Sequence, residues 1–299
     1  MIDRYEFEIL NAIADRAIDS NQVRTLSDRL HISGTKVSES IDKLRNKNYI
    51  LNDMKTLSIS EEGLKCLETY RVKKAIILAA GFGSRMMPAT SDKPKPMVTV
   101  NGKRIIETLL DALISSDITD ITIVGGYKVE VLYELRNKYS TIKIVDNPLY
   151  ESENNISSIM QVLDELNERC YVCEADLYIS NPNVITKYQY CSNFLSSYAL
   201  ETDDWCFDVE KGYITNYRKG GKYCFNYYGI SCWTPQDCQM LREDYRKYYA
   251  KTDGKDLFWE FVPIIQENEK YHVEIRLCQK EDIMEIDNYY ELAQLDSSY

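Results

Sequence analysis

The stretch ILAAGFGSRMMPATSDKPKPM, residues 77–97, decides the fold of most of this chain. An apolar run typical of a β-strand ends at Ala80, and Gly81, Gly83, Ser84 and Arg85 follow within five residues. Glycines leave backbone N–H groups accessible, and parallel sheets bind anions at the carboxyl edge of their strands. The stretch therefore predicts a phosphate-binding loop at the end of a strand.

Two common phosphate loops do not fit this stretch. A dinucleotide-binding Gly-x-Gly-x-x-Gly sequence needs a third glycine where Met86 stands, and Pro88 interrupts the helix that should follow. A Walker loop needs Gly-Lys-Ser/Thr, which the stretch lacks. Both of these classes of nucleotide-binding protein are therefore excluded.

Strands and helices alternate from residue 73 onward. Helices are expected at 104–116, 129–138 and 156–166, and the strand segments are KKAIILAA, DITIVGG, TIKIVDN and CYVCEAD. Such alternation is typical of helices that cover a parallel sheet. We expect residues 73–299 to form a Rossmann-like α/β domain with a mostly parallel sheet.

Residues 1–72 follow a different pattern. Apolar residues fall at helical spacing in three short segments, and Ser33 and Gly34 precede the third segment as in a helix-turn-helix. A short hairpin and a helix capped at Ser60 should follow. The arrangement is similar to a winged helix of the MarR kind, so we expect a small winged helix-turn-helix domain.

DNA is one candidate partner of this small domain. The basic residues of its third helix are Lys36, Lys43, Arg45 and Lys47, and phosphate contacts dominate DNA affinity. Glu39 and Asp42 interrupt that basic face. Packing against the larger domain, or dimerisation into a homodimer, are the alternative roles.

Charge and cysteine content restrict the larger domain. Residues 1–74 carry 13 Lys and Arg against 12 Asp and Glu, whereas residues 75–299 carry 23 against 35. An acidic body argues against a nucleic-acid groove there. The nine scattered cysteines, including Cys170 and Cys173, fit buried reduced thiols. No membrane span or secretion signal is recognised, so we expect a cytoplasmic protein without a membrane partner.

The phosphate loop belongs to a longer signature. Arg85, Pro88, Thr90 and the pair Pro94-Lys95 stand at fixed distances after the glycines. Together they resemble the signature of sugar-nucleotide pyrophosphorylase-like nucleotidyltransferases. Within that superfamily residues 74–295 are most similar to bacterial CTP:phosphocholine cytidylyltransferases, through VNGKRIIE, IVGGYK, DNPLYESENNISSI, CEADLYIS, DLFWEFV and MEIDNYYEL.

This resemblance implies an enzyme that transfers CMP from CTP to phosphocholine and forms CDP-choline and pyrophosphate with Mg²⁺. Nucleotidyl transfer requires cations and amides around the phosphates and no protein nucleophile. Arg85 and the amides of 81–84 would hold the β- and γ-phosphates, and Lys95 would contact the α-phosphate and the acceptor. Asp176 and Asp287 match the family's Mg²⁺ ligands.

The two aspartates also have structural alternatives. Asp176 follows an apolar strand and could cap a turn, and Asp287 could cap the helix that starts near 288. Glu285 and Glu174 are less favoured substitutes as ligands.

Base recognition is expected at the segment GGYK, residues 125–128. Its glycines allow backbone groups to approach a ring closely, so Gly126 and Tyr127 are candidate base contacts, and the resemblance implies that the base is cytosine. Ala80, at the start of the phosphate loop, is a further candidate nucleotide contact. Asn154 and Asn155 open the next helix. The resemblance favours a substrate contact for Asn155, and helix capping is the alternative.

A trimethylammonium group is bound by aromatic faces beside a carboxylate. Trp205 follows two aspartates, and Trp259 follows Asp256 by three residues; both motifs have counterparts in the family. Trp205, Tyr228, Asp256 and Trp259 are therefore the candidate acceptor contacts. Core packing is the alternative for each tryptophan, and Trp233 is expected to be structural.

Other functions remain open on the sequence. The acceptor could be 2-aminoethylphosphonate, phosphoethanolamine or a sugar 1-phosphate. A transcription regulator could also use the transferase fold to sense a nucleotide, although the intact signature and both aspartates argue against that interpretation.

Overall fold

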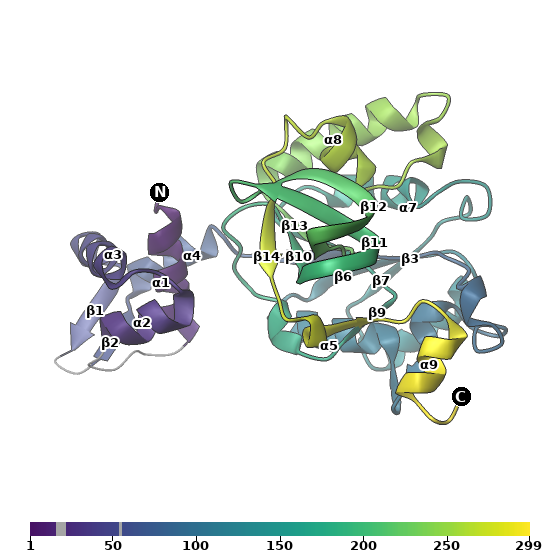
Figure 1. The fold of residues 1–299 in the computed structure, drawn as a ribbon, viewed down its shortest axis with the longest axis horizontal. Coiled ribbons are helices and arrows are strands. Elements are labelled where there is room, and N and C mark those ends of the chain that lie inside the picture. The colour runs from purple at the N-terminus through teal and green to yellow at the C-terminus, as the bar shows by residue number, and fades with distance from the viewer. Residues whose placement is uncertain (16–21, 54–55) are drawn as a thin grey trace. The chain divides into compact units, whose positions relative to one another are not determined.

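The computed structural model describes residues 1–15, 22–53 and 56–299. It divides into two compact units. The first comprises Met1–Arg71 with Tyr188–Tyr190, and the second comprises Val72–Lys187 with Cys191–Tyr299 (Figure 1).

The first unit contains three helices, a two-stranded sheet and a fourth helix. These are α1 (Arg4–Asp15), α2 (Gln22–Leu30), α3 (Gly34–Asn46), β1 (Ile50–Asp53), β2 (Thr56–Ile59) and α4 (Glu61–Glu68). Strands β1 and β2 pair antiparallel, and the expected hairpin turn at 54–55 lies outside the described residues. The side chains of Ser33 and Ser60 cap α3 and α4. Likeness to the MarR kind stays a prediction.

A nine-stranded sheet forms the centre of the second unit, in the order β11-β12-β14-β10-β13-β8-β3-β6-β7. Its strands are β3 (Lys74–Ala79), β6 (Asp120–Gly125), β7 (Lys143–Asp146), β8 (Cys170–Glu174), β10 (Asn193–Ser196), β11 (Tyr198–Glu210), β12 (Tyr213–Asn226), β13 (Ile230–Trp233) and β14 (Glu274–Leu277).

The sheet has a parallel core and a mixed second half. Strands β8, β3, β6 and β7 run parallel, as the helical crossovers between them require. Strand β13 is antiparallel to β8 and β10, and β11 and β12 form a long antiparallel hairpin. The α/β class is confirmed, but the parallel arrangement does not extend to the strands that hairpins connect.

One late strand enters the middle of this sheet. Strand β14 lies between β12 and β10, although it follows both in the chain. It pairs parallel with β10, with Asn193 opposite Glu274.

Helices cover both faces of the sheet (Figure 1). On one face are α5 (Ile105–Ser115) and α6 (Val129–Leu132), and on the other are α7 (Ile156–Gln161) and α8 (Pro235–Tyr249). Helix α9 (Tyr289–Leu295) packs apart from the sheet, in a cluster with Met86. Along β3, Ala75 and Ile77 pack in the core cluster that includes α5, whereas Ile76 and Leu78 pack in the cluster that includes α7 and α8. This alternation is that of a strand buried on both faces.

Two short ladders complete the second unit. Strand β4 (Thr99–Val100) pairs with β5 (Lys103–Arg104), and β9 (Leu177–Ile179) pairs antiparallel with β15 (Ile283–Glu285). The second ladder places Glu285 opposite Leu177, beside the end of β8.

The cysteines are free, and Cys170 and Cys173 are buried in β8. Burial raises the pKa of both thiols, so neither is poised for thiolate chemistry. Among the described helices, none is long and apolar enough to cross a membrane.

Candidate active site

The glycine-rich loop leaves β3 at the carboxyl edge of the parallel core. Gly83 has a φ of +61°, and a Cβ at this position would lie 2.8 Å from Cβ of Lys95. Its carbonyl accepts a hydrogen bond from the Thr90 hydroxyl at 2.9 Å. Only glycine combines this backbone conformation with such a close approach of Lys95.

A first cavity of about 470 Å³ opens over this loop. Its lining includes the predicted loop residues Ala80, Gly81, Gly83, Ser84 and Arg85, together with Lys95, Asn155, Asp176 and Asp287. The structure thus brings nine sequence-predicted residues from four separate segments to one cavity.

The segment predicted to contact the base does not line this cavity. Gly126 and Tyr127 are absent from its lining, whereas Phe82 and Tyr150 are present. A Cβ on Gly126 would lie 2.7 Å from the Tyr150 side chain, and Tyr127 donates its backbone N–H to the Ala80 carbonyl at 3.2 Å. Tyr127 therefore joins this segment to the glycine-rich loop, and the rings of the exposed Phe82 and the half-buried Tyr150 line the cavity instead.

Lys95 and Arg85 are both paired with aspartates. The Lys95 ammonium lies 3.0 Å from Asp176 Oδ2 and 3.3 Å from Asp287 Oδ1. The Arg85 guanidinium makes two 3.2 Å hydrogen bonds to the Asp287 carboxylate. Burial lowers the pKa of Lys95, but the charges of the two aspartates more than offset it, so the pKa is raised.

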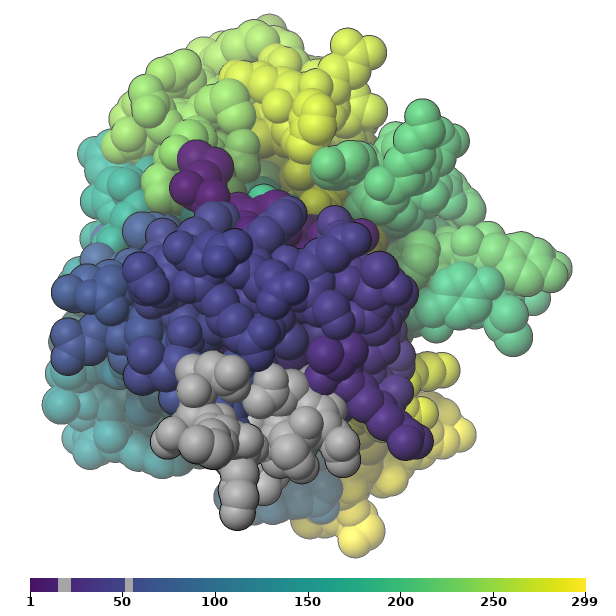
Figure 2. All heavy atoms as spheres, turned by 90° about the vertical axis from the view of Figure 1, so that its left-hand side faces the viewer, coloured from purple at the N-terminus to yellow at the C-terminus, as the bar shows by residue number. Residues whose placement is uncertain are grey.

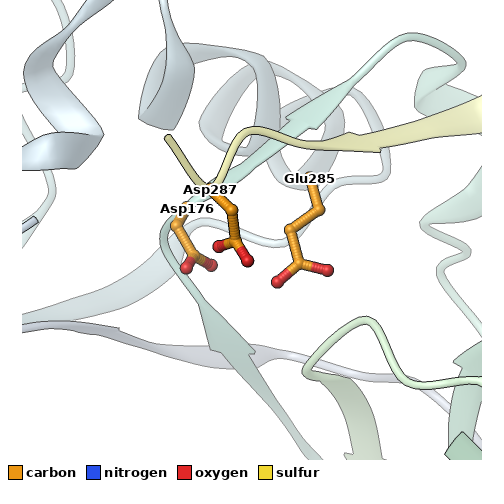
Figure 3. A group of neighbouring side chains, drawn as sticks. All are labelled: Asp176, Glu285 and Asp287. Atoms are coloured by element: carbon orange, nitrogen blue, oxygen red, sulfur yellow. The ribbon is translucent and has the colours of Figure 1, made fainter. Parts of the chain in front are cut away.

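Three carboxylates meet beside these cations. Asp176, Glu285 and Asp287 each offer an oxygen, and these atoms lie within 4.8 Å of one another (Figure 3). Asp176 follows β8, whereas Glu285 ends β15 and Asp287 follows it, so the β9–β15 ladder assembles the group. Burial, and then the charges of the two aspartates, raise the pKa of Glu285 to about 8.

This group fits a divalent cation. The buried Oδ1 of Asp176 finds no hydrogen-bond partner among the described residues. Carboxylate oxygens are the ligands that Mg²⁺ prefers, and an unpaired buried oxygen needs such a partner. Asp176 and Asp287 line the first cavity and Glu285 lines the second, so a cation here would be held by residues of both cavities.

The second cavity, of about 700 Å³, lies along the β11–β12 hairpin. The predicted acceptor contacts Trp205 and Tyr228 both line it. Trp205 stacks on Tyr217 with ring centroids 4.7 Å apart, and the Tyr228 hydroxyl lies 2.7 Å from the Ser197 hydroxyl. The charged residues in its lining are Glu201, Asp204, Lys280, Glu285 and Glu291.

Trp259 and Asp256 lie elsewhere. Trp259 is 0 % exposed and stacks on Phe194 in the core, and neither Trp259 nor Asp256 belongs to the lining of the two cavities. The neighbour of Trp259, Phe258, lines the first cavity instead. In this structure the cage predicted from both tryptophans is not assembled.

Asn154 and Asn155 connect two segments. Asn155 Oδ1 accepts the Trp259 N–H at 2.8 Å, and Asn154 donates to the Asp256 carbonyl at 3.0 Å. Neither side chain caps α7. Both asparagines therefore fix the 254–259 segment, and Asn155 also faces the first cavity.

Glu174 and Glu260 are neighbouring acids, of which Glu260 is buried whereas Glu174 is half-buried and lines the first cavity. Glu174 accepts a hydrogen bond from the Tyr227 hydroxyl at 3.1 Å, and Glu260 accepts one from Tyr217 at 3.1 Å. Burial raises the pKa of Glu260 to about 7, despite the bond from Tyr217. Sequence reasoning missed Glu260, because only its position directly after the buried Trp259 could have marked it.

The predicted DNA-binding cations, three in α3 and Lys47 directly after it, are paired within the first unit, whose surface is purple to blue in Figure 2. Lys36 pairs with Glu39, Arg45 with Asp42, Lys43 with Asp3, and Lys47 with Glu6. A DNA phosphate would have to displace these carboxylates. DNA binding therefore stays a prediction. None of the four cations named for it is free of a carboxylate partner.

Comparison with known proteins agrees with this geometry. The family model described as nucleotidyl transferase matches residues 74–199. The 2-aminoethylphosphonate cytidylyltransferase of Lancefieldella rimae is 33% identical over 241 residues, which cover 79% of this chain and 98% of that relative. The choline-phosphate cytidylyltransferase of Streptococcus pneumoniae is 31% identical over 229 residues, which cover 75% of this chain and 96% of the relative.

A solved structure matches the second unit as well. The CTP:phosphocholine cytidylyltransferase from Streptococcus pneumoniae superposes with a TM-score of 0.70 at 30% identity, covering 76% of this chain and 99% of that one. The glycine-rich loop, Lys95 and Asp176 lie inside the matched segment 74–199. Glu285 and Asp287 follow that segment in the same structural unit. This chain therefore belongs to the nucleotidyl transferase family.

Proposed function

We propose that this chain transfers the cytidylyl group of CTP to 2-aminoethylphosphonate and releases pyrophosphate. The class of acceptor is inferred from the lining of the second cavity, which contains four carboxylates and one lysine. One of these carboxylates, Glu285, lies beside the other candidate metal ligands. Such a lining favours an acceptor whose far end is a cation. A relative named for this acceptor supports the choice.

The nucleotide would occupy the first cavity. Arg85 and the loop amides would hold the β- and γ-phosphates, and Lys95 would contact the α-phosphate, because these groups line the cavity around one point. Asp176 and Asp287, with Glu285 beside them, would hold Mg²⁺, which neutralises charge on phosphate oxygens when bound. The cytidine preference rests on the names of the relatives.

The transfer itself is a displacement at phosphorus. A phosphonate oxygen of the acceptor attacks the α-phosphorus of CTP, the bond from that phosphorus to the bridging oxygen breaks, and pyrophosphate leaves with the electron pair. Lys95 would lie between the two anions and reduce their repulsion. The protein contributes position and charge and needs no covalent intermediate.

Phosphocholine is the second candidate acceptor. The rings of Trp205 and Tyr228 line the second cavity, and ring faces attract a trimethylammonium group. A primary ammonium instead needs oxygen acceptors at hydrogen-bonding distance, which the cavity carboxylates supply. With Trp259 packed in the core, the carboxylates are the more complete set, so we place 2-aminoethylphosphonate first.

Pyrophosphate release distinguishes these possibilities. CTP, UTP, dTTP and ATP are each tested with 2-aminoethylphosphonate, phosphoethanolamine, phosphocholine and glucose 1-phosphate. We expect CTP with 2-aminoethylphosphonate to give the highest kcat/KM. Preference for phosphocholine selects the second candidate, preference for a sugar phosphate contradicts both, and no release with any pair favours a nucleotide sensor.

A substitution in the second cavity tests the acceptor site directly. Asp204→Asn should raise the KM for the acceptor and leave the KM for CTP unchanged, because it removes one charge from the second cavity only. Asp203→Asn is the matched control, since the neighbouring Asp203 is exposed and lines neither of the two cavities. Equal effects of both variants on both substrates would contradict the acceptor assignment.

A further inference from the structure

One carboxylate at the start of α9 holds the backbone of Asp287. Glu291 Oε2 accepts the Asp287 N–H at 2.6 Å, and Glu291 Oε1 accepts the Asn288 side-chain amide at 2.8 Å. In return, Asn288 Oδ1 accepts the Glu291 N–H at 3.0 Å, which makes Asn288 the N-cap of α9. Glu291 therefore links the N-cap residue Asn288 to the backbone of Asp287.

Asp287 depends on this contact because the neighbouring ladder stops short of it. The pairing of β15 with β9 ends at Glu285, opposite Leu177. Beyond that point the Glu291 carboxylate bonds the Asp287 N–H and so restrains the backbone that aims the Asp287 carboxylate at Arg85 and Lys95. A charge-assisted hydrogen bond of this kind is shorter and stronger than a neutral one.

Glu291 is itself anchored by the core. Its neighbour Leu292 is 0 % exposed and packs in a cluster with Met86 and Ile286. Met86 ends the 3₁₀ turn Ser84–Met86 of the glycine-rich loop. One small cluster therefore fixes α9, the residue before Asp287 and the phosphate loop together.

We propose that Glu291 is a positioning residue that sets the cation affinity of the active site through Asp287. The inference rests on the proposed function, because it takes Asp287 as a ligand of the divalent cation. Glu291 does not itself belong to the group of three carboxylates that converge on that point. Its effect is to keep the Asp287 carboxylate pointing toward the carboxylates of Asp176 and Glu285.

Manganese binding to the full chain tests this proposal. Mn²⁺ affinity is measured by electron paramagnetic resonance in the presence of CTP, alongside the Tm of each variant. Glu291→Ala should weaken Mn²⁺ binding by about tenfold or more, the effect typical of residues that orient a ligand. Glu291→Gln keeps one acceptor oxygen for the Asp287 N–H and should restore most of the affinity.

Asp296→Ala is the matched control. Asp296 Oδ2 also accepts a backbone N–H, that of Asn101 at 2.7 Å, but directly after the other end of α9. It should lower the Tm to a similar extent and leave Mn²⁺ affinity unchanged. If it weakens Mn²⁺ binding as much as Glu291→Ala does, general loss of stability explains the result and the proposal is wrong.

Asp287→Ala separates this inference from the proposed function. If Asp287→Ala binds Mn²⁺ weakly while Glu291→Ala binds it like the wild type, the positioning role is wrong and the metal assignment stands. If Asp287→Ala also keeps wild-type affinity, Asp287 is not a ligand, and both the metal assignment and the role of Glu291 are wrong.

Discussion

Lys95 and Asp176 form an ion pair in which Nζ lies 3.0 Å from Oδ2, although the two residues are 81 positions apart in the chain. Lys95 is only 8 % exposed, and it also contacts Asp287. The pair places a largely buried positive charge between the phosphate loop and the acidic group. That position suits a cation that must lie against two phosphate groups at once.

Replacing Lys95 tests its role in transfer. Lys95→Ala should lower kcat by about 10²–10³-fold, the usual effect of removing one group that stabilises transition-state charge. Steady-state pyrophosphate release measures the effect. Lys93→Ala is the control, because Lys93 lines neither cavity and pairs with its neighbour Asp92, at 3.5 Å. A Lys95→Ala enzyme with near wild-type turnover would contradict the assignment.

Gly83→Ala should damage the phosphate loop more than its backbone conformation alone explains. The left-handed conformation costs an alanine about 1–2 kcal/mol, and the new Cβ would lie 2.8 Å from Cβ of Lys95. Gly102→Ala has the same conformational cost at φ +82° with no heavy atom within 4 Å. We expect urea unfolding to show a larger loss for Gly83→Ala, accompanied by weaker CTP binding. Equal losses, with CTP binding intact, would show that Lys95 adjusts freely.

The two tryptophans should behave differently. Trp259→Ala removes a fully buried ring and should destabilise the fold by about 3–5 kcal/mol. Trp205→Ala removes a ring that lines the second cavity, so it should raise the acceptor KM and leave the CTP KM unchanged. Chemical denaturation and two-substrate kinetics measure these effects. A Trp259→Ala protein of normal stability with a raised acceptor KM would restore the predicted cage.

Glu260 gives the stability of the protein a dependence on pH. Burial raises its pKa from 4.5 to about 7, so the folded state favours the neutral carboxyl. This contribution is fully present below pH 4.5 and is lost as the pH rises toward 7. Glu260→Gln stays neutral and should therefore be more stable than the wild type at alkaline pH, by on the order of 3 kcal/mol.

Urea unfolding of the wild type and Glu260→Gln across this pH range is the measurement. Glu269→Gln, at an exposed position in the same part of the chain, is the control and should keep the wild-type pH profile. Identical profiles for Glu260→Gln and the wild type would mean that Glu260 ionises normally.

The first unit should bind random duplex DNA weakly at low salt, because each of the four cations named above already has a carboxylate partner. Exposed pairs of this kind are worth little, so removing the carboxylates should release the cations. The double variant Glu39→Gln with Asp42→Asn is therefore expected to bind DNA more tightly in fluorescence anisotropy. Tight wild-type binding that falls steeply with salt would contradict this view.

The sequence predicted the phosphate loop because its residues obey constraints that act locally. Gly83 needs a positive φ, and Lys95 follows within one continuous segment, so their spacing is visible without any tertiary information. Asp176 follows β8 at an edge that parallel topology defines. Asp287 follows β15 of the separate antiparallel ladder, and only the family resemblance marked it as a ligand. The α/β class and the nucleotidyl transferase family were both accessible from these residues.

Other features depend on contacts that no local pattern encodes. Trp259 packs inward because the chain turns at 258–262, and the direction of a ring at such a turn depends on the partner, here Phe194. The interior position of Glu260 depends on Tyr217, which lies 43 residues earlier. The mixed half of the sheet depends on hairpins whose partners the strand pattern does not specify.

The position of β14 also governs the order in which the sheet can form. Its parallel pairing partner β10 lies 81 residues earlier, from Asn193 to Glu274, so closing this pair costs considerable chain entropy. The hairpin of β11 and β12 can form early, because its strands adjoin in the chain. Its ladder pairing with the remaining strands runs through β14, however, so we expect this pairing beside the second cavity to form late in folding.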